Sequence, residues 1–172
     1  MTKTLRIAVA CVGLLWASAA AAAEAPHTLG VGYKIGNGLG FLGADAVLGV
    51  GEHLSLGLQA NYFSDTSELG DKYTGYGVLP FVQYRFRAPG SSPYLSAGPL
   101  YAHVRLNDVT AAAYGAVLNA GWEWIWSSGI AINVGAGASY LGKITATDGF
   151  TTVERGGGVA FNIEAALRYY FF

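Results

Sequence analysis

The stretch that decides the fold is Gly157-Gly-Val-Ala-Phe-Asn-Ile-Glu-Ala-Ala-Leu-Arg-Tyr-Tyr-Phe-Phe172, at the end of the chain. Its apolar residues recur at every second position, and the alternate face carries Glu164 and Arg168. Successive side chains of a β-strand point to opposite faces, so this period predicts one long strand with a continuous apolar face. A strand of a transmembrane barrel needs an apolar face toward lipid, a polar face toward the lumen and aromatic residues at the interface. The stretch meets all three requirements.

The same alternation recurs along the rest of the chain. An even number of such strands is typical of a closed membrane barrel. The sequence therefore predicts an all-β fold, an eight-stranded antiparallel up-and-down transmembrane β-barrel. The phase stays open in one segment, where Leu95, Ala97, Pro99 and Tyr101 form the better outward set but His103 then points outward too. The seven earlier segments are 28–36, 39–50, 54–63, 73–86, 93–104, 112–126 and 129–141.

The connections between these segments differ in length. Asn37-Gly38 predicts a tight turn, and short turns follow the second, fourth and sixth segments. Longer polar loops are predicted at 64–72, 105–111 and 143–155. With the N-terminus in the periplasm, the short turns after the second, fourth and sixth segments fall there and the longer loops fall outside. The tight turn after the first segment breaks this pattern. Outward aromatic residues form two girdles, the periplasmic one with Tyr84, Phe86, Trp122, Trp124, Trp126, Tyr169 and Phe171, and the outer one with Tyr62, Tyr76, Tyr114 and Tyr140.

Composition supports the barrel against its soluble alternative. Hydrophobic residues make up 52% of the 172 residues and charged residues only 12%, about half the usual charged share. A soluble lipocalin-like binding barrel also alternates, but it turns its apolar face inward. Its outer surface here would be glycine-rich and poor in charge, which makes a poor soluble surface. Glycine suits a crowded lumen better.

The N-terminus predicts a cleaved signal peptide over residues 1–23. Lys3 and Arg6 precede a short apolar core, and Ala21-Ala22-Ala23 offers a cleavage site; a retained signal anchor is the alternative. Cleavage leaves a barrel domain of residues 24–172, which is 149 residues (172 less 23), without Cys11 and with a formal charge of −3 (8 basic, 11 acidic). No basic patch indicates a nucleic-acid partner.

These features, with Tyr169-Tyr170-Phe171-Phe172 at the end, resemble the small outer-membrane barrels of Gram-negative bacteria. That group includes the OmpA transmembrane domain, OmpX, OmpW and the opacity-type proteins. The resemblance implies a cell outer membrane location, contact with outer-membrane lipid, and insertion by the barrel assembly machinery through those four residues. We expect a monomer. One departure is that the apolar phase ends at Phe171, whereas the family pattern usually ends it at the final residue.

Charged residues on the inward faces balance each other. Eight strands enclose a lumen that side chains just fill, and a buried charge without a partner costs several kcal/mol. We therefore expect a lumen ion network in which Lys34 bridges Asp45 and Glu164; a charged pathway for ions is the alternative. The network comprises Lys34, Asp45, Arg85, Glu123, Glu164 and Arg168.

Catalytic chemistry finds little support. Outer-membrane lipid A deacylases and acyltransferases use serine and histidine, and a nucleophile needs its base within hydrogen-bond reach. The three histidines, His27, His53 and His103, form no His-x-Ser pair on a strand face. No metal cluster or cofactor motif is present, so the expectation is a non-enzymatic barrel, with a lipid-modifying enzyme as the alternative.

Pro80 and Pro99 suggest a specific mechanism for this barrel, a weak point between two neighbouring strands. Proline cannot donate to a strand ladder, so closed barrels normally exclude it. If Phe86 pairs with Pro93, residue numbers across this hairpin sum to 179 and Pro80 faces Pro99. We expect either a bulge that sets curvature or a lateral seam. With Leu79, Phe81 and Leu100 lining an apolar pocket, the function is either structural or a conduit for a small hydrophobic ligand.

Overall fold

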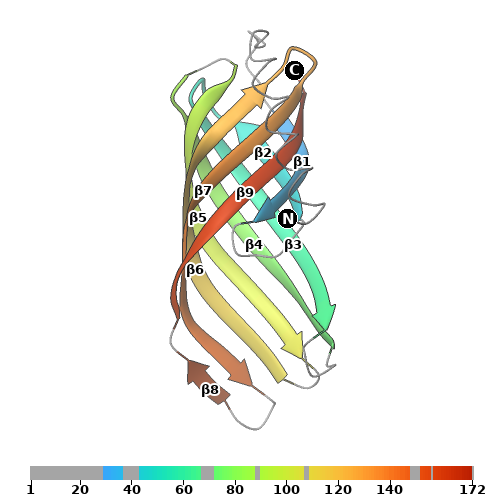
Figure 1. The fold of residues 1–172 in the computed structure, drawn as a ribbon, viewed down its shortest axis with the longest axis vertical. Coiled ribbons are helices and arrows are strands. Elements are labelled where there is room, and N and C mark those ends of the chain that lie inside the picture. Colours follow the sequence, from blue (N-terminus) through green and yellow to red (C-terminus); the bar gives the residue numbers. More distant parts are fainter. Residues whose placement is uncertain are drawn as a thin grey trace, which may run out of the picture.

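Antiparallel β-strands close into one barrel in the computed structural model, which describes residues 29–36, 43–66, 72–87, 90–106, 109–147, 152–155 and 157–171 (Figure 1). The strands are β1 (Leu29–Gly36), β2 (Gly43–Gly49), β3 (Leu54–Thr66), β4 (Lys72–Arg85), β5 (Ser92–Leu106), β6 (Val109–Ile125), β7 (Ile130–Thr147), β8 (Thr152–Arg155) and β9 (Gly158–Phe171). From β1 to β7, each strand pairs with the next, and β9 closes the ring between β7 and β1. The predicted barrel of eight strands is confirmed. None of the described residues forms a helix long and apolar enough to cross a membrane.

The short strand β8 is the far part of the eighth strand. On β7, Leu141 faces Gly158 of β9 and Ile144 faces Arg155 of β8, so both pieces keep one register. The segment 143–155, predicted as the longest loop, is therefore mostly strand. Its threonines read as polar loop residues, yet β-branched residues suit strands. The other two loops are also shorter than predicted, because β3 and β5 run further and β4 and β6 begin earlier.

We call the end of the barrel with Leu29 and Phe171 the terminal end, and the opposite end, where β8 lies, the hairpin end (Figure 1). Two glycines with positive φ make the terminal-end turns tight: Gly90, at 104°, and Gly129, at 85°. At the second turn, Gly129 N donates to Trp126 O over 2.9 Å. Glycine adopts positive φ without steric cost, so these turns stay short.

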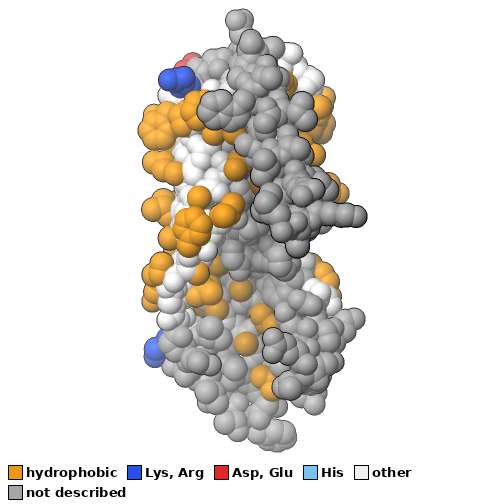
Figure 2. Space-filling view, viewed as in Figure 1, with side chains coloured by type: hydrophobic (Ala, Val, Ile, Leu, Met, Phe, Trp, Pro, Cys, Tyr) orange, Lys and Arg blue, Asp and Glu red, His pale blue; other side chains and the backbone are white. Residues whose placement is uncertain are grey.

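The predicted alternation appears as alternating exposure. Along β9, Phe161, Ile163 and Leu167 are exposed, whereas Glu164 and Arg168 are buried. Figure 2 shows hydrophobic side chains over much of the described surface, with Lys and Arg side chains near its two ends. The lipocalin-like alternative requires the opposite arrangement and is wrong. Many of the aromatic residues that were predicted to point outward are exposed. They are Tyr62, Tyr76, Tyr84, Phe86, Tyr114, Tyr140, Tyr169 and Phe171.

Strand β5 adopts the predicted outward set. Leu95 is exposed, while Tyr94 and Leu100 are buried. His103 points outward and stacks on Tyr76 of β4, with ring centroids 5.1 Å apart. This contact gives the histidine an aromatic neighbour at the barrel surface, which resolves the ambiguity of the sequence.

The strands are strongly staggered around the ring. Following paired residues once around, from Glu123 back to β6, ends at Ala113, ten residues from the start. Stagger and strand number together set the tilt, here about 35–45°, and the width of the lumen. Eight strands leave an interior that side chains fill. The pairs used are Glu123–Asn133, Asn133–Ala166, Ala166–Lys34, Lys34–Gly43, Gly43–Asn61, Asn61–Gly77, Gly77–Ala102 and Ala102–Ala113.

Candidate functional site

All six residues of the predicted ion network lie inside the barrel. Each is at most 4% exposed, because alternation points it inward from β1, β2, β4, β6 or β9. Most lie toward the terminal end, since Glu123 is two residues and Arg168 three residues from the ends of their strands. The structure therefore gathers the predicted set, and its pairing shows how the lumen is filled.

Arg168 is the centre of this network. Its Nε and Nη2 donate to the two carboxylate oxygens of Asp45, over 2.5 and 3.0 Å. Its Nη1 donates to Glu123 Oε1 over 2.7 Å. Arg85 Nη1 lies 3.9 Å from the other oxygen of Glu123. One guanidinium thus compensates two buried carboxylates, the planar geometry that favours arginine over lysine.

The predicted bridge by Lys34 is half correct. Lys34 Nζ lies 2.8 Å from Glu164 Oε2, but Asp45 pairs with Arg168 instead. The reason is the register: Gly32 pairs with Arg168 on one side and with Asp45 on the other. Because Gly32 has no side chain, Arg168 reaches across it. Counting residues from the strand ends puts Lys34 level with both carboxylates, but the stagger of the strands shifts Asp45 toward Arg168.

Glu164 has further donors that sequence reasoning missed. Its carboxylate accepts hydrogen bonds from the Tyr94 hydroxyl and, over 2.7 Å, from Asn119 Nδ2. Tyr94 also donates to Asn133 Oδ1, 2.7 Å away. The signal for Tyr94 was its place opposite Arg85 in the 179 register, which puts it on an inward face.

The four aromatic residues predicted as the insertion signal divide between two faces. Tyr169 and Phe171 are 46% and 48% exposed, whereas Tyr170 is 2% exposed and donates to Glu123 Oε1 over 3.0 Å. Tyr170 therefore belongs to the lumen network in the structure. Phe172 lies outside the described residues.

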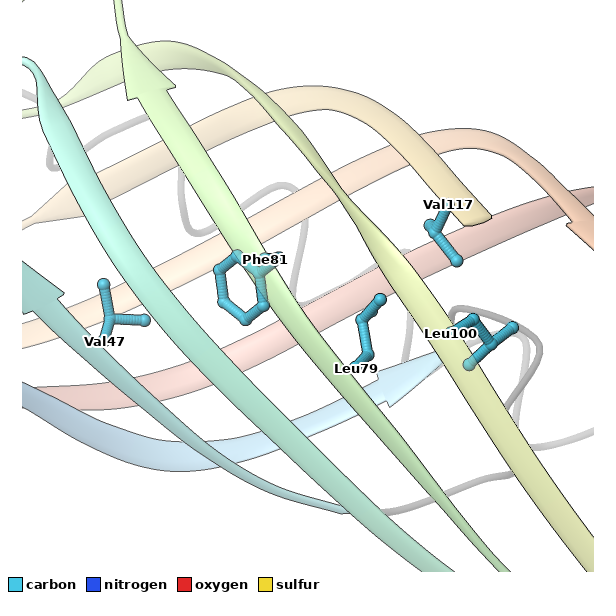
Figure 3. Close-up of a cluster of buried hydrophobic side chains, with 5 residues drawn as sticks. All are labelled: Val47, Leu79, Phe81, Leu100 and Val117. Carbon is cyan, nitrogen blue, oxygen red and sulfur yellow. The ribbon is translucent and has the colours of Figure 1, made fainter. Parts of the chain in front are cut away.

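An apolar cluster adjoins the network inside the barrel. Leu79 and Phe81 of β4 and Leu100 of β5, the residues predicted for an apolar pocket, pack together there (Figure 3). Leu100 lies eight residues from the terminal end of β5, further along the barrel than Arg168. The Phe81 ring fits because β3 has Gly57 opposite it, where a Cβ would lie only 2.1 Å from the ring atom Cζ. The full cluster is Val47, Leu79, Phe81, Leu100 and Val117.

Pro80 and Pro99 face each other as the register predicts. Phe86 N donates to Pro93 O over 3.1 Å, and Val82–Ala97 and Val78–Tyr101 keep the sum of 179. Pairing between β4 and β5 is interrupted in between, within a fully described stretch. The backbones still approach closely, since a Cβ on Gly98 would lie 2.9 Å from Phe81 Cα. The interruption is therefore a closed seam.

A void of about 160 Å³ lies against this seam, too narrow to admit a water molecule. Its lining combines the three features of the lumen. Lys34 and Asn119 belong to the network, Leu79, Phe81 and Val117 to the apolar cluster, and Gly98 to the seam. A ligand could enter this region only by displacing these side chains, and it would then meet apolar and charged groups together.

Both described histidines, His53 and His103, contact aromatic rings or backbone groups of neighbouring strands. His53 Nδ1 donates to the carbonyl oxygen of Arg85 over 2.8 Å, and its ring stacks on Tyr84. His103 stacks on Tyr76, and His27 lies outside the described residues. Among the residues that the structure describes, no group of His, Cys, Asp and Glu could hold a metal ion. Neither described histidine is arranged beside a nucleophile in these contacts.

Comparison with known proteins identifies the fold. The chain matches no protein-family model and no curated protein sequence. Its structure is similar to neisserial surface protein A, with a TM-score of 0.57 and 13% identity over 83% of this chain and 94% of that one. It is also similar to the outer membrane protein AlkL, solved in lipid bilayers, with a TM-score of 0.58 and 13% identity over 87% and 94% of the two chains. At this identity the likeness establishes the eight-stranded barrel fold.

Proposed function

We propose that the chain is an integral outer-membrane barrel without catalytic activity, which passes small hydrophobic molecules between its lumen and the bilayer. The observation that carries the proposal is the apolar cluster lying directly beside the interrupted β4–β5 pairing. A molecule in the cluster is separated from the membrane by two strands that lack ladder pairs from Leu79 to Phe81. Such a stretch opens at lower cost than a fully paired one.

Membrane residence follows from the surface. Outward residues on the strands are largely apolar and exposed, and a continuous apolar surface of this extent needs lipid around it. Both structural neighbours support this, because one is a surface protein and the other an outer membrane protein in lipid bilayers. The proposal includes cleavage after residue 23, insertion by the assembly machinery through the aromatic end, and a monomeric barrel.

The lumen itself is proposed to be plugged. Three basic and three acidic side chains fill its terminal half and neutralise each other. A hydrated ion would have to break Arg168 from Asp45 and Glu123, which leaves buried charges unpaired at a cost of about 3–5 kcal/mol. Passage straight through is therefore blocked, and the lateral route remains.

Restoring the ladder tests the conduit. Pro80→Val with Pro99→Val returns two backbone donors, so hydrogen exchange of the β4 and β5 amides around the seam should slow. Uptake of the apolar dye phenylnaphthylamine by cells that carry this variant should fall below that of the wild type. The matched control is Pro93→Val, because Pro93 lies outside the interrupted stretch. Slower exchange with unchanged uptake would leave a purely structural barrel.

A further inference from the structure

Lys34 stands where the ion network meets the apolar cluster. Its Nζ lies 2.8 Å from Glu164 and 4.7 Å from the centroid of the Phe81 ring. It also lines the void against the seam, together with Leu79 and Val117. The positive group that a molecule in the cluster would meet is therefore Lys34.

The bonding of this ammonium leaves it able to take a second anion. An ammonium carries three donors, and among the described residues Lys34 has one carboxylate partner, Glu164. Glu164 keeps the hydrogen bonds from Tyr94 and Asn119 whatever Lys34 contacts. Arg168, in contrast, is held by two carboxylates deeper in the network.

The carboxylates of the network are each engaged by cations or hydrogen-bond donors. Asp45 and Glu123 hold Arg168, and Glu164 accepts from Lys34, Tyr94 and Asn119. The site therefore offers a positive charge, and no open negative one, to the head of a ligand whose chain lies on the apolar cluster. This arrangement of charge favours the binding of an anionic amphiphile over a cationic one.

We infer that the lumen selects amphiphiles with an anionic head, such as long-chain carboxylates, over uncharged molecules of the same chain length. Lys34 holds the carboxylate, while Leu79, Phe81 and Val117 contact the chain. The inference rests on the proposed function and names its substrate class. A charge-assisted bond in a low-dielectric lumen is stronger than a neutral one, so a preference of about tenfold or more is expected.

Titration of the full barrel in lipid nanodiscs tests the selectivity. Dodecanoate and its methyl ester share a chain and differ in charge, and protein-observed NMR at the β4 and β5 amides reports binding; empty nanodiscs correct for partition into lipid. The wild type should bind dodecanoate about tenfold more tightly than the ester. Lys34→Met combined with Glu164→Gln keeps the lumen neutral, and it should bind both equally. Arg87→Met removes an exposed charge at the turn between β4 and β5 and should keep the wild-type preference.

Different failures are separable. Equal binding of the acid and the ester by the wild type overturns the selectivity while leaving the conduit intact. A preference that persists in the double variant shows that Lys34 does not hold the head, which also overturns the inference. If neither ligand binds the wild type, the conduit itself fails. A heat-dependent gel shift of each variant confirms that the barrel is folded before titration.

Discussion

Single residues decide whether the lumen charges are compensated. Arg168 pairs with Asp45 and is also the nearest cation to Glu123, whereas Lys34 serves one carboxylate that has two other donors. Removing one partner of a buried ion pair lowers stability by more than the intact pair contributes to it. The reason is that the remaining charge is then buried with neither a partner nor water. Unequal losses are therefore expected from two substitutions of the same kind.

Arg168→Met should lower the free energy of unfolding by about 3–5 kcal/mol, because it removes the ion-pair partner of Asp45 and also the nearest cation from Glu123. Urea unfolding of the barrel in detergent, followed by circular dichroism, measures this loss. Lys34→Met should cost less, since Glu164 retains Tyr94 and Asn119. Arg87→Met, at an exposed position in the turn between β4 and β5, is the charge-removal control. A loss from Lys34→Met that equals or exceeds the loss from Arg168→Met would contradict this ranking.

Among the elements, β9 shows how one strand serves two environments. Its outward residues Tyr169 and Phe171 stack edge to face, with ring centroids 5.1 Å apart, while Tyr170 between them bonds to Glu123. The outward pair lies where an amphipathic aromatic ring is favoured, at the membrane interface. The strand therefore combines an outward aromatic surface with a part of the lumen network.

Phe171→Asp should impair insertion more than Phe172→Asp, because Phe171 lies in the outward apolar phase. A carboxylate that faces lipid raises the free energy of the inserted barrel. Near the membrane interface this free-energy cost is smaller but still unfavourable. The fraction of the protein in the outer-membrane pellet, with its heat-dependent gel shift, measures insertion. Equal effects of the two substitutions would mean that the insertion signal follows the other phase.

At the scale of the whole molecule, the described residues form a barrel of eight strands with a stagger of ten residues. This size leaves no wide pore, and the network fills the terminal half of the lumen with neutralising pairs. A charged lumen could still conduct if its side chains lined an open path. Here they bond to one another across it.

Planar-bilayer recordings of the purified protein should show no large, stable single-channel currents, because permeation requires breaking buried ion pairs. The protein should also migrate faster unheated than boiled on a denaturing gel, which shows that the barrel in the recordings is folded. Arg168→Met, which opens the network, is the comparison variant. Large wild-type currents would show an open pore and remove the argument for a lateral route.

The sequence by itself determined the barrel and the orientation of its residues. The period of two is local, so it identified the inward residues Lys34, Asp45 and Glu164 without knowledge of any contact. The short turn after Phe86 likewise determined that Pro80 faces Pro99, because a hairpin register follows from its turn. The polar segment 143–155 misled, because its threonines read as loop residues although β-branched residues suit strands.

Only the tertiary structure decided which charges meet. Ring closure with its stagger places Arg168 and Asp45 on either side of Gly32, and no local pattern contains that information. The same closure brings Tyr94 and Asn119 from β5 and β6 onto Glu164 of β9. Partner choice in a barrel lumen depends on how far each strand slides before the ring closes, which is a property of all eight strands together.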